Sequence, residues 1–407
     1  MAIVIVEPSS SGLSLLPAAN RLGETVYVLS ANTDDRNLPA SYADKAYKVI
    51  QAETNDAASI VAAVKTIADH VSAVIPGFEY VVGSVSEASA TLGLPHLGAH
   101  AALQTRNKYA CRQTLASHAV RVPRFYSINA VEDAEQAALH VGFPAVLKPI
   151  NGCGSLFVKK VHDRSQLQRE LALLAGDGLV DMGLRVGTEL LLEEYVQGNE
   201  YSIEGYIGPD GPNIVAVTEK ILGAEPYFVE MGHVVDALLS PQQRQDVERY
   251  IHAVVKAIDM NIGVFHAELR LSNAGPVLME IAARLGGDKI HRLVEITHEV
   301  SLPEVMIRCY QERPPVHQKK SGGCVSSVGF FALDAQQYTG INTSIIERVR
   351  SFNGFQEFEV YYQAGAELPP LTDFRGRLGH VLLSAPTRDE LNANMSEALG
   401  LIAQAVY

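Results

Sequence analysis

The first hundred residues alternate short apolar runs with segments whose apolar residues recur at helical spacing. Runs of strand length include Ala2–Val6, Thr25–Leu29 and Ala73–Pro76. Helical spacing is found in Leu13–Leu22, Asn55–His70 and Tyr80–Leu92. Because strands and helices alternate, this region predicts a parallel sheet with helices on its faces.

A polar turn of small residues, Glu7–Gly12, follows the first predicted strand. Ligands bind outside the carboxyl ends of strands in such sheets, so this turn is a candidate substrate or phosphate contact. An ordinary loop has the same composition, and that alternative stays open. The turn lacks the G-x-G-x-x-G spacing of a dinucleotide site.

Beyond residue 100 the regular alternation gives way to a mixed pattern. Predicted helices include Thr105–Ala119, Gln242–Ile258, Lys289–Thr297, Pro303–Glu312 and Thr387–Ala405. Predicted strands include Leu156–Val161, Glu189–Tyr195, Glu200–Ile207, Gly323–Leu333, Phe355–Tyr362 and Arg377–Ser384. Strand runs dominate from Glu189 to about Glu230, and the final segment mixes strands with a last helix.

The segment from Phe265 to Ile290 contains two glutamates, Glu268 and Glu280, each in an apolar, strand-like setting. The Asn-Ala-Gly-Pro turn between them predicts a hairpin that brings both carboxylates onto one surface. Arg284 and a Gly-Gly pair follow. Two carboxylates and an arginine beside a glycine turn suit a divalent metal bound to phosphate. Two strand glutamates in ordinary salt bridges would give the same pattern.

Lys148 closes the apolar run Pro-Ala-Val-Leu-Lys-Pro, and a small glycine-bearing loop, Asn151–Ser155, follows it. This placement favours an anion contact for the lysine, although a lysine that reaches out to solvent is the alternative. The backbone N–H groups of Gly152, Gly154 and Ser155 are candidates to close over phosphates. Without a G-K-[ST] ending, the loop is not a Walker P-loop.

A second polar pattern, Glu193-Glu194-Tyr195-Val196, ends one predicted strand, and Glu200 begins the next. Backbone groups at a strand end can bind the edge of an adenine, and a carboxylate can hold ribose hydroxyls. A charged hairpin is the alternative for this segment taken alone.

Charge and cysteine content limit the class of protein. The formal net charge of -13 disfavours general binding to nucleic acid or to anionic membranes. The four scattered cysteines form no C-x-x-C pair, which argues against a zinc site or a disulfide framework. The N-terminal run predicts a buried strand and not a signal peptide, and no apolar run is long enough to span a bilayer. We therefore expect a soluble, cytoplasmic protein.

Taken together, Lys108, Lys148, the glycine loop, the E-E-Y-V-x-G-x-E pattern and the paired glutamates before Arg284 resemble the ATP-grasp superfamily. The resemblance covers nearly the full chain to about Lys289 and continues weakly beyond it. It implies an α/β and α+β fold that binds ATP between two α+β subdomains. The expected parts are an N-terminal parallel α/β domain at residues 1–100, a central domain with the small lid at 101–195, and a C-terminal α+β domain at 196–407.

The resemblance also implies roles for these residues. Lys108 and Lys148 would contact the phosphates and adenine of ATP. The adenine hinge would consist of Glu193, Glu194, Tyr195 and Val196, and Glu200 would hold the ribose. Glu268 and Glu280 would bridge the magnesium ions, two of which are expected.

The stretch Glu280-Ile-Ala-Ala-Arg284 departs from the common Glu-x-Asn form, because Ala282 cannot coordinate magnesium. This form resembles the L-amino-acid ligases of the bacilysin type. That resemblance implies that Arg284 neutralises charge near an acylphosphate and that Glu230 holds the amino group of the first substrate. His233 would lie near the phosphoryl group or the carboxylate, and a structural histidine is the alternative.

Asp288 stands where we expect a bulky aromatic residue in the bacilysin-type enzyme, and Gly287 precedes it. We therefore expect a roomier and more acidic pocket for the carboxylate-donating substrate, one that accepts an amide- or amine-bearing side chain. Arg284, His233 and Lys148 are the candidate catalytic residues.

These observations predict ATP-dependent amide-bond formation between two amino acids or amino-acid derivatives through an acylphosphate, with release of ADP and phosphate. Another ATP-grasp ligase of purine or carboxylase type, or a nucleotide-binding protein without catalysis, are the alternatives. The predicted partners are small-molecule substrates only, and a homodimer is an expected state because dimers are common among relatives.

Overall fold

The N-terminal region forms a four-stranded parallel sheet in the computed structural model, which describes residues 1–31, 47–174, 179–181, 184–186, 189–313 and 323–407. Its strand order is β3-β2-β1-β4, with bounds β1 Ala2–Val6, β2 Thr25–Ser30, β3 Tyr47–Gln51 and β4 Val71–Pro76. The helices are α1 Leu15–Arg21, α3 Ala57–Lys65 and α4 Val82–Thr91. Ile3 and Ile5 pack in one core, and Val4 and Val6 in another, because helices cover both faces. The predicted parallel sheet is confirmed.

A second four-stranded sheet, here the small sheet, is antiparallel and has the order β5-β10-β6-β7. Its strands are β5 Phe125–Ile128, β6 Ala145–Pro149, β7 Lys159–Val161 and β10 Leu190–Glu194, and its helices are α7 Ala134–Val141 and α8 Arg164–Leu174. Leu147 packs in the core with these helices, while Val146 and Lys148 point to the other face. The strand predicted from Leu156 begins only at Lys159, because Ser155 and Phe157 have left-handed backbones with φ of 58° and 59°.

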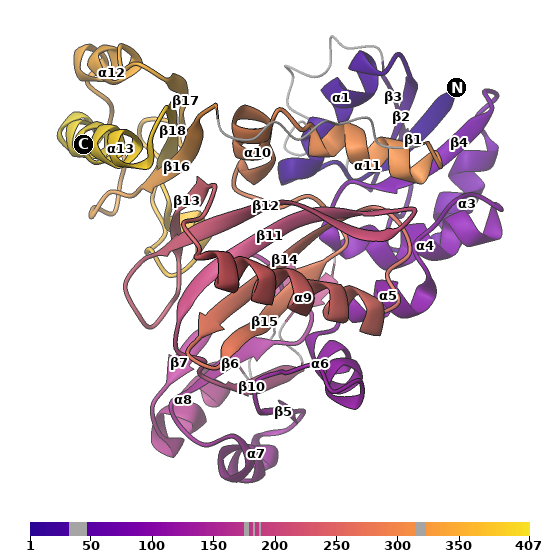
Figure 1. Cartoon of the computed structure of the whole chain (residues 1–407), viewed down its shortest axis with the longest axis horizontal. Coiled ribbons are helices and arrows are strands. Elements are labelled where there is room, and N and C mark those ends of the chain that lie inside the picture. The colour runs from indigo at the N-terminus through magenta and orange to yellow at the C-terminus, as the bar shows by residue number, and fades with distance from the viewer. Residues whose placement is uncertain (32–46, 175–178, 182–183, 187–188, 314–322) are drawn as a thin grey trace.

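An eight-stranded antiparallel sheet forms the centre of the molecule (Figure 1). Its order is β15-β14-β11-β12-β13-β16-β18-β17. The bounds are β11 Asn199–Gly208, β12 Gly211–Leu222, β13 Glu230–Val235, β14 Val264–Ser272, β15 Gly275–Ala282, β16 Val325–Phe331, β17 Phe355–Val360 and β18 Gly379–Ala385. Because β13 pairs with β16, the C-terminal strands continue the central sheet. The predicted boundary at 195/196 falls between β10 and β11, and the predicted domain limits stay predictions.

Helices cover this central sheet on several sides (Figure 1). One face packs against α9, Pro241–Ala257, which begins with a capping box between Ser240 and Gln243. Near the N-terminal sheet lie α10, Ile290–His298, and α11, Leu302–Tyr310, while α12, Thr343–Arg350, and α13, Arg388–Ala405, pack on the C-terminal strands. The remaining elements are α5 Ala99–Gln104, α6 Lys108–Ser117, β8 Leu179–Asp181 and β9 Leu184–Val186. Among the described residues, no helix is long and apolar enough to cross a membrane.

Candidate active site

Glu268 and Glu280 lie directly opposite each other on β14 and β15. The predicted hairpin is therefore confirmed, and its turn is Asn273–Ala274. The pairing depends on a β-bulge. From Ser272↔Gly275 to Leu269↔Leu278 the register is regular, and then Met279 is passed over, so that Glu280 pairs with Glu268. Without the bulge, Glu280 would point to the opposite face, which packs against α9.

The bulge also frees a backbone acceptor. The carbonyl oxygen of Met279 accepts hydrogen bonds from Arg112 Nη2 at 2.7 Å and from Lys148 Nζ at 3.3 Å. Lys148 comes from β6 of the small sheet, so this contact joins the small sheet to the hairpin. One irregular position therefore orients both a carboxylate and a lysine.

Buried Lys220, on β12, lies beneath three carboxylates. Its Nζ is 2.7 Å from Glu230 Oε1, 2.8 Å from Glu268 Oε1 and 3.2 Å from Glu200 Oε1. Burial acts to lower the pKa of Lys220, but the three carboxylates outweigh it and raise that pKa well above its usual range. Burial likewise acts to raise the pKa of Glu268, but Lys220 and His266 hold it well below its usual range. The sequence analysis did not identify Lys220. The only local indication is that Lys220 lies two positions after buried Thr218, so both side chains point to the same face of the strand.

Two further lysines hold carboxylates on the opposite wall. Lys108 Nζ donates to Glu280 Oε1 at 2.9 Å and to the Gly152 carbonyl oxygen at 2.6 Å. Lys148 pairs with Glu193, whose second oxygen accepts from Arg112 Nε at 2.6 Å. Burial lowers the pKa of Lys148 even though Glu193 favours its charged form. Glu193 is thus a buried counter-ion for two cations.

The glycine loop lies over these groups. Gly154 has a left-handed φ of 64°, and a Cβ built on it would come within 3.1 Å of the Phe374 ring. Phe374 belongs to a short 3-10 helix, Phe374–Gly376, near the C-terminal end of the chain. The loop and this helix are therefore in close contact, which the sequence did not reveal.

Arg284 pairs with a partner from the N-terminal region of the chain. Its Nε donates to Glu79 Oε2 at 2.6 Å, and Arg106 Nη1 donates to Glu79 Oε1 at 2.7 Å. Burial acts to raise the pKa of Glu79, but Arg284 and Arg106 outweigh it and lower the pKa to about 2. Arg106 also donates to the Asn151 carbonyl oxygen at 3.0 Å, so Glu79 connects Arg284 to the base of the glycine loop. No local pattern in the sequence indicated Glu79.

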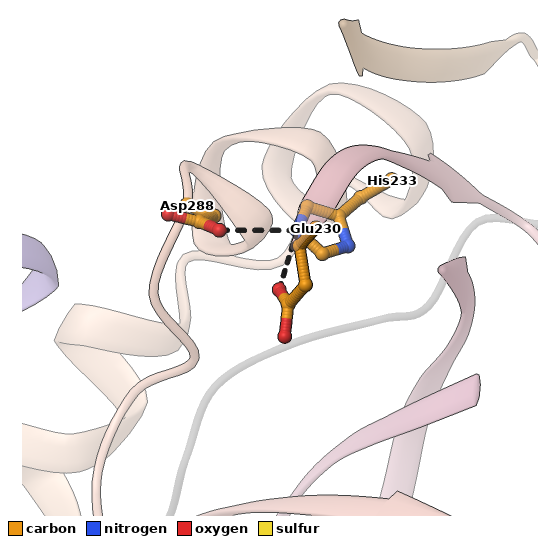
Figure 2. Close-up of side chains that lie close together, drawn as sticks. All are labelled: Glu230, His233 and Asp288. Atoms are coloured by element: carbon orange, nitrogen blue, oxygen red, sulfur yellow. Dashed lines mark hydrogen bonds and ion pairs between the residues drawn. The ribbon is translucent and has the colours of Figure 1, made fainter. Parts of the chain in front are cut away.

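A further group of polar side chains consists of Glu230, His233 and Asp288, which lie side by side (Figure 2). His233 Nε2 is 3.1 Å from Glu230 Oε2 and 3.4 Å from Asp288 Oδ2. Burial acts to lower the pKa of His233, but hydrogen bonds to both carboxylates raise it. Arg377 forms a bidentate pair with Asp288. This corrects the expectation of a more acidic pocket, because a guanidinium balances the charge of Asp288.

A single cavity of about 460 Å³ collects most of the predicted residues. It is lined by Lys108, Lys148, Gly152, Gly154, Ser155, Glu193, Glu194, Val196, Glu200, Glu230, Glu268, Glu280, Arg284, Gly287 and Asp288. The polar turn Ser9–Gly12 after β1 lines it as well. Two predicted residues, His233 and Tyr195, are not among the lining residues. His233 is buried behind Glu230 and Asp288. The Tyr195 ring stacks on Phe228, with 6.2 Å between the ring centroids. Arg270, which donates from Nε to Glu200 Oε2 at 2.9 Å, and Arg377 are lining residues that the sequence did not predict.

Comparison with known families agrees with this geometry. Residues 141–292 match the ATP-grasp domain family. Residues 342–406 match L-amino acid ligase C-terminal domain 2. The chain therefore contains an ATP-grasp domain. The ATP-grasp match spans β6 to β15, and so includes both lysine-bearing β6 and the paired glutamates.

Individual relatives cover most of this chain. The uncharacterized protein y4rH of Sinorhizobium fredii is 24% identical over 404 residues, which are 98% of this chain and 81% of that protein. The L-arginine-specific L-amino acid ligase of Bacillus subtilis is 23% identical over 300 residues, 71% of this chain and 70% of that enzyme. The crystal structure of an L-amino acid ligase from Bacillus licheniformis superposes with a TM-score of 0.81 at 20% identity, covering 98% of this chain and 96% of that one. The predicted ATP-grasp fold is confirmed.

The hairpin of this ATP-grasp domain has donor chemistry that fits a divalent cation. The side chains of Glu268 and Glu280 are 21% and 22% exposed at the cavity, and each already faces an ammonium group, from Lys220 and Lys108. Magnesium prefers such carboxylate oxygens, with water and phosphate completing its shell. Ala282 lines the same cavity and offers no ligand.

Proposed function

We propose that this protein is an ATP-dependent ligase that joins two amino acids, or amino-acid derivatives, through an amide bond and releases ADP and phosphate. The observation that carries the proposal is the direct pairing of Glu268 with Glu280 in a cavity that also contains Lys108, Lys148 and Arg284. The match to L-amino acid ligase C-terminal domain 2 and the similarity to an L-arginine-specific L-amino acid ligase support amino acids as substrates.

A carboxylate does not react with an amine at neutral pH, because oxide is a poor leaving group. Transfer of the γ-phosphoryl group of ATP to the carboxylate gives an acylphosphate, and phosphate then leaves when the amine attacks. The protein must align the two groups, balance their charge and exclude water. We assign charge balance to Lys148 and Arg284, which line the cavity.

In this proposal Glu268 and Glu280 would hold two magnesium ions, which would supply positive charge beside the phosphates of ATP. The ammonium groups of Lys108 and Lys220 lie beside these carboxylates. Both can remain in place and balance the excess negative charge of the site. The backbone of Gly152, Gly154 and Ser155 would donate hydrogen bonds to phosphate.

The nucleotide would lie at the small-sheet end of the cavity. Val196 and Glu194 line this end, and Tyr195 continues the strand end that would bind the adenine edge. Glu193 also lines the cavity there and is the buried counter-ion of Lys148. Glu200 would hold the ribose, and Arg270 keeps its carboxylate in place.

The carboxylate-donating substrate would lie at the opposite end. Glu230 would bind its amino group, and Arg284 would lie near its carboxylate. His233 is fully buried, so we assign it a positioning role through its contacts with Glu230 and Asp288. Gly287 leaves open space beside this position, since a Cβ built there would meet no atom within 4 Å.

The decisive experiment incubates the protein with ATP, magnesium and amino acids, singly and in pairs, and measures phosphate release. Release that requires two amino acids, with a dipeptide found by mass spectrometry, supports the proposal. Release with bicarbonate or a purine precursor alone would favour another ATP-grasp ligase. Tight ATP binding without release in any mixture would favour a binding protein. Light scattering of the same sample tests the expected homodimer.

A further inference from the structure

Arg377 reaches from the residues before β18 to Asp288, which precedes α10. Its Nη1 donates to Asp288 Oδ2 at 2.7 Å, and its Nη2 donates to Asp288 Oδ1 at 2.8 Å. Both residues line the cavity at the end proposed for the carboxylate-donating substrate. Only 4% of Arg377 is exposed, so the pair is largely shielded from water.

The guanidinium of Arg377 is held on every side. Its centre lies 3.9 Å from the centre of the Phe330 ring, its Nε donates to the Phe374 carbonyl oxygen at 3.2 Å, and its Nη1 contacts the Glu230 carbonyl oxygen at 3.3 Å. Phe330 also meets the ring of His233 edge-on at 6.0 Å. Arg377 is therefore preorganised, and a substrate that displaced it would have to break all of these contacts.

Asp288 is fixed by its backbone as well. Asp288 and Lys289 are consecutive non-glycine residues in the left-handed region, with φ of 52° and 64°. Such a conformation costs about 1 kcal/mol per residue and persists where the surroundings determine it. Three contacts hold the backbone in this conformation. They are the bidentate pair with Arg377, the contact of Asp288 with His233, and the bond from Lys289 Nζ to Glu357 Oε1 at 2.8 Å.

The charges at this end are matched. Arg377 faces Asp288, and Lys220 faces Glu230, so among the described residues each of these two carboxylates already has a cationic partner. A cationic side chain would have to take Asp288 from Arg377, and an anionic one would face both Asp288 and Glu230. The open space beside Gly287 belongs to a cavity that Ile290 and Met306 also line, and these apolar side chains suit an uncharged substrate side chain.

We propose that Arg377 determines substrate specificity by occupying Asp288, so that the carboxylate-donating amino acid carries an uncharged side chain. This inference rests on the proposed ligase function. It narrows the expected amide- or amine-bearing side chain to the amide. It also explains why Asp288, an acidic residue at the substrate end, does not make the pocket acidic.

The test measures kcat/KM for ATP-dependent phosphate release with panels of neutral, cationic and anionic amino acids as the carboxylate donor. Wild-type protein should favour neutral side chains. Arg377→Met, which keeps length and removes charge, should raise the cationic-to-neutral ratio at least tenfold, because Asp288 loses its guanidinium partner. Asp288→Asn should raise the anionic-to-neutral ratio, and the double variant should return to neutral preference.

Arg375→Met is the matched control. Arg375 lies in the short helix Phe374–Gly376 and pairs with Asp373, the residue that caps this helix. Its side chain is 47% exposed, so its removal should leave the ranking unchanged. Arg377→Lys keeps the charge without the fork and should give a smaller shift; if Arg377→Met fails to fold, Arg377→Lys and Asp288→Asn carry the test.

Active variants that keep the wild-type ranking would overturn the inference, as would a wild-type preference for charged side chains. If wild-type protein releases phosphate with no amino acid, the ligase proposal fails instead.

Discussion

Glu280 faces Glu268 across β14 and β15 because the intervening Met279 bulges out of register. The same bulge presents the Met279 carbonyl oxygen to Lys148 and Arg112. The position of both carboxylates at the cavity thus depends on one extra residue in one strand.

Glu280→Gln and Glu268→Gln should each lower ATP-dependent phosphate release by at least about 100-fold, because an amide binds a divalent cation far more weakly than a carboxylate does. Glu248→Gln, an identical change on the exposed side of α9, should leave the rate unaltered. A steady-state phosphate assay at several magnesium concentrations checks this. Full activity in both variants would show that Glu268 and Glu280 do not bind the metal.

Lys220→Met should destabilise the fold by about 3–5 kcal/mol, because three carboxylates lose the buried cation that they share. Urea unfolding measures the change. Added magnesium should restore more stability to this variant than to wild-type protein, since a cation bound at Glu268 replaces part of the lost charge. Equal stabilisation of both proteins by magnesium would contradict this explanation.

Glu79→Gln should also cost about 3–5 kcal/mol at pH 7, because Arg284 and Arg106 lose a buried partner. The pKa of Glu79 is lowered in the folded state to about 2, so its contribution is complete above the unfolded pKa of 4.5 and is lost as the pH falls toward 2. The stability difference between wild type and variant should therefore shrink between pH 5 and pH 3.

Urea unfolding across this pH series gives the measurement. Glu304→Gln, which removes a pair with Arg21 whose side chain is 50% exposed, is the control and should cost less than about 1 kcal/mol. A constant difference between wild type and Glu79→Gln over the whole range would show that the Glu79 charge does not contribute.

Gly154→Ala should destabilise the glycine loop by about 1–2 kcal/mol, because its φ is 64° and the new Cβ would press on the Phe374 ring. Gly83→Ala is the matched control. Gly83 is exposed on α4, and a Cβ there meets nothing within 4 Å, so alanine should be neutral or stabilising. Thermal unfolding separates the two, and a larger loss for Gly83→Ala would refute the argument.

The sequence by itself determined the fold class and most members of the candidate site. Alternating apolar runs predicted the parallel N-terminal sheet, since burial on two helical faces leaves a local pattern. The order of Lys148, the glycine loop, Glu200 and the paired glutamates indicated an ATP-grasp site, because each motif is a short stretch of chain. Their roles stay predictions.

Only the tertiary structure decided which charges balance one another. Glu79 is 205 residues from Arg284, and Arg377 is 89 residues from Asp288, so no local pattern links the members of either pair. The bulge at Met279 leaves no signature either, because a shift of one residue is a compromise between strand pairing and the packing around it. The physical reason is the same for the two ion pairs and for Glu280, which the bulge orients. A buried charge is stabilised by whichever partners the fold brings to it.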